Sequence, residues 1–125
     1  MIRIEICTNG YQSVINAQDN GADCAELCES LEVGGVTPSY GTLKKVASDM
    51  KIPVRVLIRP RSGNYIYNDA ELEMMCSDIE LIKELGRTLG VAMELSPVGT
   101  CRASFDGGVY EFEKTDDAIA FESNR

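Results

Sequence analysis

Segments with strand-like alternation are separated by segments with helical spacing, and this order constrains the fold more than any other feature. The strand-like segments are IRIEIC (2–7), CAELC (24–28) and IPVRVLI (52–58), and apolar residues follow a helical period at 11–22, 40–50 and 70–85. Ser39 is placed to cap the second helix, and Gly86 is placed to end the third. Strands that alternate with helices of this length predict a parallel sheet with right-handed crossovers. A chain of 125 residues is long enough for one such domain.

The three strands are apolar on one face only, which separates two kinds of α/β fold. A doubly wound sheet is covered by helices on both faces, so its strands are apolar throughout. Here the second face carries three sets of residues: Arg3, Glu5 and Cys7; Cys24, Glu26 and Cys28; Arg55, Leu57 and Arg59. Charges of both signs suit the interior of a (β/α) barrel, where Glu5 and Glu26 can pair with Arg55 or Arg59.

Composition excludes several classes of function. The net charge of −8 disfavours nucleic acid and anionic membranes as partners, because both require a clustered basic surface. No apolar run is long enough to span a membrane and the first residues do not form a signal peptide, so a cytoplasmic protein with reduced thiols is expected. Histidine is absent, so Ser-His-Asp and Cys-His catalysis are excluded and a metal must use thiolate, carboxylate or thioether ligands.

The polar residues allow both structural and functional interpretations. Cys7 and Cys28 are either small buried hydrophobic residues or soft-metal ligands. Glu5 and Glu26 are either structural ion-pair partners or a general acid and base, with the structural interpretation favoured.

The loops and the other cysteines are also open to two interpretations. GGVTPS (34–39) is more simply a turn and helix cap than a phosphate cradle. Arg59 and Arg61, with Tyr65 and Tyr67 in the following loop, could form an anion-facing rim. Cys76 and Cys101 do not lie at a motif-like spacing from a second cysteine, and Met74 and Met75 fit a helix core.

Several of these segments resemble the CutC family, the copper homeostasis protein. The resemblance covers residues 2–86 and rests on IEIC, GADCAELCESLEVGGVTPSYG, IPVRVLIRPRSGNYIYND and DIELIKELG, with ELC, GGVTPS and IRPR in the family's order. It implies a TIM-type (β/α) barrel, of which this chain would supply the first three to four βα units. It also implies a copper(I) site formed by Cys7 and Cys28. Cys24 stands where the family usually has arginine.

The chain departs from the family after Gly86. Residues 87–125 are expected to form a divergent tail with a fourth strand at GVAMEL (90–95) and a short strand at VYEFE (109–113) that could cover a sheet edge. A truncated product, an alternative exon or a shifted reading frame would each give this pattern. A partial barrel leaves strand edges open, so self-association or weakly cooperative folding is expected.

Two functions of different class follow. The first is a non-enzymatic copper homeostasis protein that binds copper(I) through Cys7 and Cys28, which are expected at the same level on neighbouring strands. The alternative is a barrel enzyme that acts on a small anionic or sugar-like substrate through Glu5, Glu26 and Arg59. The first is favoured, with copper ion and a second copy of the chain as the expected partners.

Overall fold

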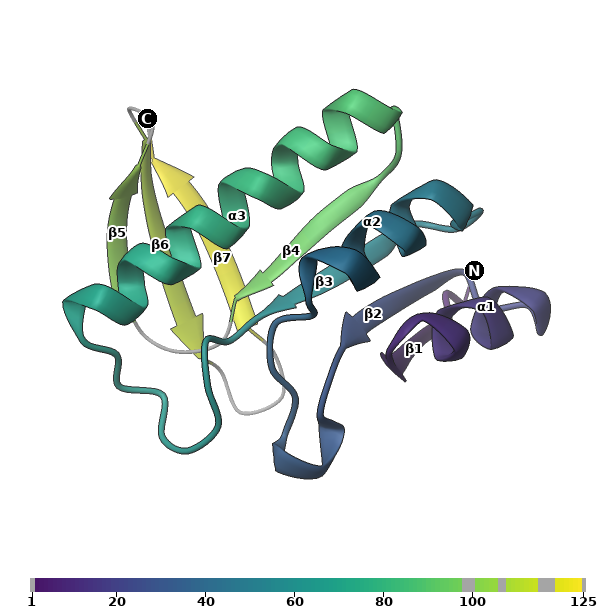
Figure 1. Ribbon diagram of the computed structural model, residues 1–125, viewed down its shortest axis with the longest axis horizontal. Coiled ribbons are helices and arrows are strands. Elements are labelled where there is room, and N and C mark those ends of the chain that lie inside the picture. Colours follow the sequence, from purple (N-terminus) through teal and green to yellow (C-terminus); the bar gives the residue numbers. More distant parts are fainter. Residues whose placement is uncertain (1, 98–100, 106–107, 115–118, 125) are drawn as a thin grey trace.

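The computed structural model describes residues 2–97, 101–105, 108–114 and 119–124, with side chains up to Ser96. Its main feature is a parallel four-stranded sheet in the order β1-β2-β3-β4 (Figure 1). The strands are β1 (Glu5–Asn9), β2 (Cys24–Cys28), β3 (Val54–Ile58) and β4 (Met93–Pro97). The connecting helices are α1 (Tyr11–Asp19), α2 (Tyr40–Asp49) and α3 (Asp69–Leu89), and a 3₁₀ turn, η1 (Leu31–Val33), follows β2. The predicted parallel βαβ order is therefore confirmed.

All three helices cover the same face of this sheet (Figure 1). One cluster of buried residues joins them to the strands: Val14 of α1, Leu43 and Val46 of α2, Met75, Ile79 and Ile82 of α3, and Ala25, Leu27, Val54, Val56 and Ile58 of the sheet. Leu27, Val56 and Ile79 are fully buried, so this layer is the hydrophobic core. The strands contribute their apolar positions to this layer, and Thr8 of β1, which is paired with Leu27, is buried on the same face.

The opposite face of the sheet, called here the polar face, carries the residues that alternation placed there. Cys7 is paired with Glu26, Glu26 with Arg55, and Arg55 with Glu94, so these four residues form one level across the four strands. Paired residues of parallel strands point to the same side of the sheet. The predicted polar face of a partial TIM-type barrel, which includes Glu5 and Glu26, is thus observed.

Helix α3 does not end where the glycine signal predicted. It continues past Gly86 to Leu89, and Gly90, with φ of 66°, forms its C-cap. Gly86 instead allows a close approach, because a Cβ atom there would lie 3.3 Å from the carbonyl oxygen of Val91. The capping prediction for α2 is confirmed, since the Ser39 hydroxyl accepts the Thr42 N–H at 3.2 Å.

The tail forms a separate antiparallel sheet in the order β5-β6-β7. Its strands are β5 (Cys101–Phe105), β6 (Gly108–Lys114) and β7 (Ile119–Asn124). The VYEFE segment lies in β6, between β5 and β7, so it does not cover an edge of the parallel sheet as had been considered. The side chain of Cys101 lies outside the described part of the structure.

Candidate metal centre

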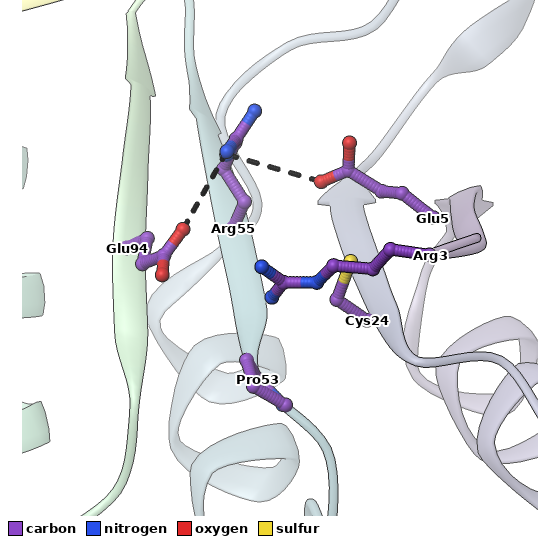
Figure 2. Close-up of a pocket in the computed structure, with 6 residues that line it drawn as sticks. All are labelled: Arg3, Glu5, Cys24, Pro53, Arg55 and Glu94. Carbon is purple, nitrogen blue, oxygen red and sulfur yellow. Dashed lines mark ion pairs between the residues drawn. The ribbon is translucent and has the colours of Figure 1, made fainter. Parts of the chain in front are cut away.

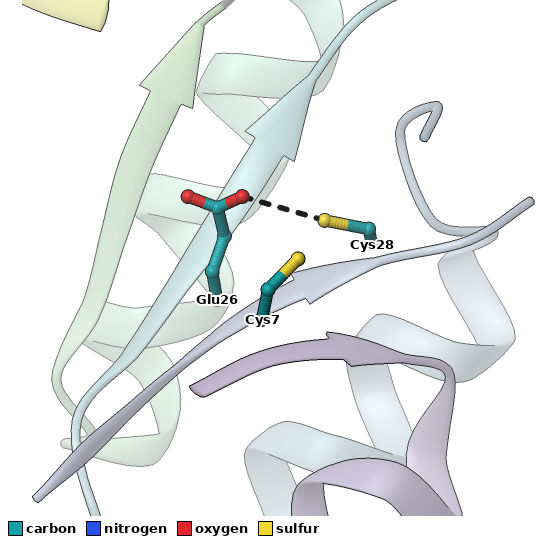
Figure 3. A group of neighbouring side chains, drawn as sticks. All are labelled: Cys7, Glu26 and Cys28. Carbon is teal, nitrogen blue, oxygen red and sulfur yellow. Dashed lines mark hydrogen bonds between the residues drawn. The ribbon is translucent and has the colours of Figure 1, made fainter. Parts of the chain in front are cut away.

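Two thiols and one carboxylate meet on the polar face of β1 and β2 (Figure 3). The sulfur atoms of Cys7 and Cys28 and a carboxylate oxygen of Glu26 all lie within 4.8 Å of one another. Alternation along β2 places Glu26 and Cys28 on the same face, and the parallel pairing places Cys7 beside Glu26. The structure thus brings the two predicted metal ligands together.

The two cysteines were expected to lie directly opposite each other on neighbouring strands, but the observed strand register differs. They are not at the same level, because Cys7 is paired with Glu26 while Cys28 is paired with Asn9. This offset of two residues puts their Cα atoms about 8 Å apart, so the side chains must lean along the strands to converge. A disulfide requires Cα atoms closer than about 7 Å, so the geometry favours two free thiols over a crosslink.

The two thiols differ in environment. Cys28 is 1% exposed, whereas Cys7 is exposed to solvent. Burial raises the pKa of the Cys28 thiol, and the adjacent Glu26 carboxylate raises this pKa further. The Cys28 thiol donates to the Glu26 carboxylate at 3.6 Å, and the Ser96 hydroxyl donates to the other oxygen of that carboxylate at 3.4 Å. The site therefore has one accessible and one enclosed sulfur.

Sequence reasoning missed part of this cluster. Glu26 was considered only as an acid, a base or an ion-pair partner, and Ser96 was not considered at all. The parity of β2 does place Glu26 between Cys24 and Cys28 on one face, so a third donor could have been found from the sequence. The contribution of Ser96 required the register of β4.

A polar pocket of about 180 Å³ lies nearer the amino ends of the strands (Figure 2). It is lined by Arg3, Glu5, Cys24, Pro53, Arg55 and Glu94. The Arg55 guanidinium lies between two carboxylates, 3.8 Å from Glu5 and 3.6 Å from Glu94. The predicted pairing of Glu5 with Arg55 is confirmed. Glu94 adds a second carboxylate beside Arg55, and its position follows from the register of β4 against β3, which the sequence did not give.

Arg59 does not act as the carboxylate partner that was expected. Its side chain is 3% exposed, and its guanidinium donates to the carbonyl oxygens of Val33 and Gly35 at 2.8 Å and of Gly63 at 3.0 Å. It also lies over the ring of Tyr65, 5.0 Å from the centroid. Arg59 thus ties the loop after β2 to the loop after β3.

The remaining loop residues have structural partners. The Arg61 guanidinium donates to the carbonyl oxygens of Asn64 and Ile66 in its own loop and pairs with Glu71 in the first turn of α3, so it holds this loop against the helix. In GGVTPS, the Thr37 hydroxyl accepts the backbone N–H of Arg59 at 2.8 Å. A Cβ atom at Gly35, whose φ is +90°, would lie 2.8 Å from a methyl of Leu57. These contacts favour the turn-and-cap interpretation of that segment.

The three candidate catalytic residues have separate environments. Glu5 contacts Arg55, Glu26 contacts Cys28 and Ser96, and Arg59 contacts loop carbonyls. The pocket that Glu5 lines includes neither of the other two. The groove between β1 and α1 is lined by none of the three.

Helices on one face, a parallel sheet and polar residues on the other face define a segment of a (β/α) barrel with a thiol-rich interior. The model of the CutC family matches residues 2–101, which extends the resemblance through β4. The chain belongs to the CutC family.

Named relatives and a solved structure agree with this assignment. The human "Copper homeostasis protein cutC homolog" is 47% identical over 83 residues, which are 66% of this chain and 30% of the relative. A CutC family protein of Pasteurella multocida is 47% identical over 85 residues, covering 68% of this chain and 35% of the relative. The crystal structure of a putative copper homeostasis protein CutC from Streptococcus agalactiae superposes with a TM-score of 0.65 at 37% identity, covering 79% of this chain and 47% of that one.

The chain spans about a third of the length of the curated relatives it matches. Among the described residues, no helix is both long enough and apolar enough to cross a membrane.

Proposed function

We propose that this chain binds copper(I) as its cargo through the thiolates of Cys7 and Cys28. The observation that carries the proposal is the convergence of these two sulfurs and the Glu26 carboxylate within 4.8 Å. The human relative that matches 66% of this chain and the solved structure that covers 79% of it both bear the name copper homeostasis protein, which supports the same assignment.

The chemistry of the donor set favours copper(I) over the other common metals. Copper(I) prefers soft sulfur ligands and accepts low coordination numbers, so two thiolates suffice. Structural zinc sites usually have four ligands, whereas this cluster offers three and the chain contains no histidine. Magnesium and calcium prefer sites built from oxygen ligands.

The charges of the site act in opposite directions on metal binding. Both thiols must lose their protons to become ligands, and the Glu26 carboxylate opposes this by raising the pKa of Cys28. A bound cation reverses that effect, because it is attracted by both the thiolates and the carboxylate. Glu26 would therefore contribute charge to the loaded site whether or not it is a direct ligand.

An anaerobic competition titration with a coloured copper(I) chelator tests this proposal. The parent chain is expected to withdraw one copper(I) ion per chain, and the double variant Cys7→Ser/Cys28→Ser is expected to withdraw none at the same chelator concentration. Cys76→Ser is the matched control, because Cys76 lies on α3 and packs against the core on the other face of the sheet. Equal stoichiometry in the parent and the double variant would exclude this site.

A further inference from the structure

We infer that strand β1 pairs with the β1 strand of a second copy of this chain, in the antiparallel direction, around a two-fold axis at Ile4. Strand β1 is an edge of the parallel sheet, and the isoleucines before it and within it are unusually exposed for apolar side chains. Ile2 is 87% exposed, Ile4 50% and Ile6 40%. Exposed edges of this kind are templates for pairing with another strand.

The backbone groups at this edge are directed for pairing. The N–H of Ile4 donates to the Asp23 carboxylate at 2.7 Å, and its carbonyl oxygen accepts from the N–H of Asp23 and of Cys24, so Ile4 turns its backbone toward β2. The direction of these groups alternates along a strand. Arg3 and Glu5 therefore direct their N–H and C=O groups away from β2, toward the open edge.

The sequence around β1 selects one register for two antiparallel copies. With Ile4 opposite the partner's Ile4, each Arg3 faces the partner's Glu5 and each Ile2 faces the partner's Ile6. All opposed pairs are then either apolar or of opposite charge, which stabilises a sheet. A shift of two residues in one direction places Arg3 opposite Arg3, and a shift in the other direction places Glu5 opposite Glu5. A shift of one residue places charges opposite isoleucines.

The helix-covered face and the polar face of the sheet both offer contacts for a second copy of the chain beside β1. On the helix side, an apolar groove of about 320 Å³ between β1 and α1 is lined by Ile4, Ile6, Ser13, Asn16, Ala17, Asn20, Gly21 and Ala22. In the selected register, the partner's Ile2 and Ile4 lie beside this groove. On the polar face, Arg3 makes no ion pair or hydrogen bond with any described residue, whereas Glu5 makes one long contact with Arg55. The second copy supplies Arg3 with a carboxylate.

Sedimentation velocity of the 125-residue chain over a wide concentration range tests this pairing. The parent is expected to form a reversible dimer. Arg3→Glu and Glu5→Arg each place like charges at both ion pairs, and each is expected to weaken dimerisation at least about tenfold. An equimolar mixture of the two variants is expected to form a heterodimer, because two acidic side chains on one copy then face two basic side chains on the other. The double variant Arg3→Glu/Glu5→Arg is expected to dimerise like the parent.

Charge-matched controls are Lys44→Glu on α2 and Glu32→Arg in η1, both exposed and away from β1, and neither is expected to change association. Circular dichroism checks that each variant is folded. If a charge variant does not fold, Ile4→Lys replaces it, because two lysines would then face each other at the two-fold axis. A monomer at every concentration would overturn the inference, as would association that persists in both single variants or a mixture that fails to dimerise.

Discussion

Replacement of Arg59 by methionine is expected to lower the free energy of unfolding by about 2–3 kcal/mol, because three buried or half-buried carbonyl groups lose their charged donor. The side chain is 3% exposed and links the carbonyls of Val33, Gly35 and Gly63. Methionine fills a similar volume but donates no hydrogen bond. Urea denaturation followed by circular dichroism measures the difference.

Arg61→Met is the matched control for this prediction. Arg61 also donates to several carbonyl oxygens, but they belong to its own loop and the side chain is 37% exposed, so water can replace the lost donors. We expect a loss of about 1 kcal/mol or less in that variant. Equal losses in the two variants would show that Arg59 does not join the two loops in the way that the structure indicates.

The second large effect is expected at the metal site. Cys28→Ser should weaken copper(I) binding by about a hundredfold, or about 2.7 kcal/mol, because one of two soft ligands is exchanged for a hydroxyl. Glu26→Gln should weaken it by less than about tenfold, since that change removes a charge while both sulfurs remain. Chelator competition under anaerobic conditions measures both affinities. A larger loss in Glu26→Gln than in Cys28→Ser would reverse the assigned roles of carboxylate and thiol.

The alternation of apolar and polar residues was sufficient to predict the parallel sheet and its polar face. A local signal predicted the Ser39 cap, because capping depends on residues close in sequence. Gly86 was misassigned as a helix end because a second glycine, Gly90, lies four residues further on and adopts the left-handed conformation that caps α3. The arrangement of β5, β6 and β7 as an antiparallel sheet was also not predicted.

The candidate site was predicted only in part for a similar reason. Residue types and the family resemblance indicated Cys7 and Cys28, and the structure brings their sulfurs together. Whether the two cysteines lie side by side depends on the register of β1 and β2. They were expected to be directly paired, but the observed register separates them by two residues. Arg59 was expected to pair with a glutamate, but it donates to loop carbonyls instead. Alternation along a strand predicts the face on which a side chain lies, but it does not predict which loop groups the side chain reaches.

X-ray absorption spectroscopy at the copper edge of the copper(I)-loaded chain tests the central claim most directly, because it reports the ligand atoms themselves. We predict a low-coordinate copper(I) ion with two sulfur ligands in the parent, and loss of that sulfur shell in Cys7→Ser/Cys28→Ser. A first shell of oxygen or nitrogen atoms alone in the parent, or a sulfur shell unchanged in the double variant, would contradict the claim.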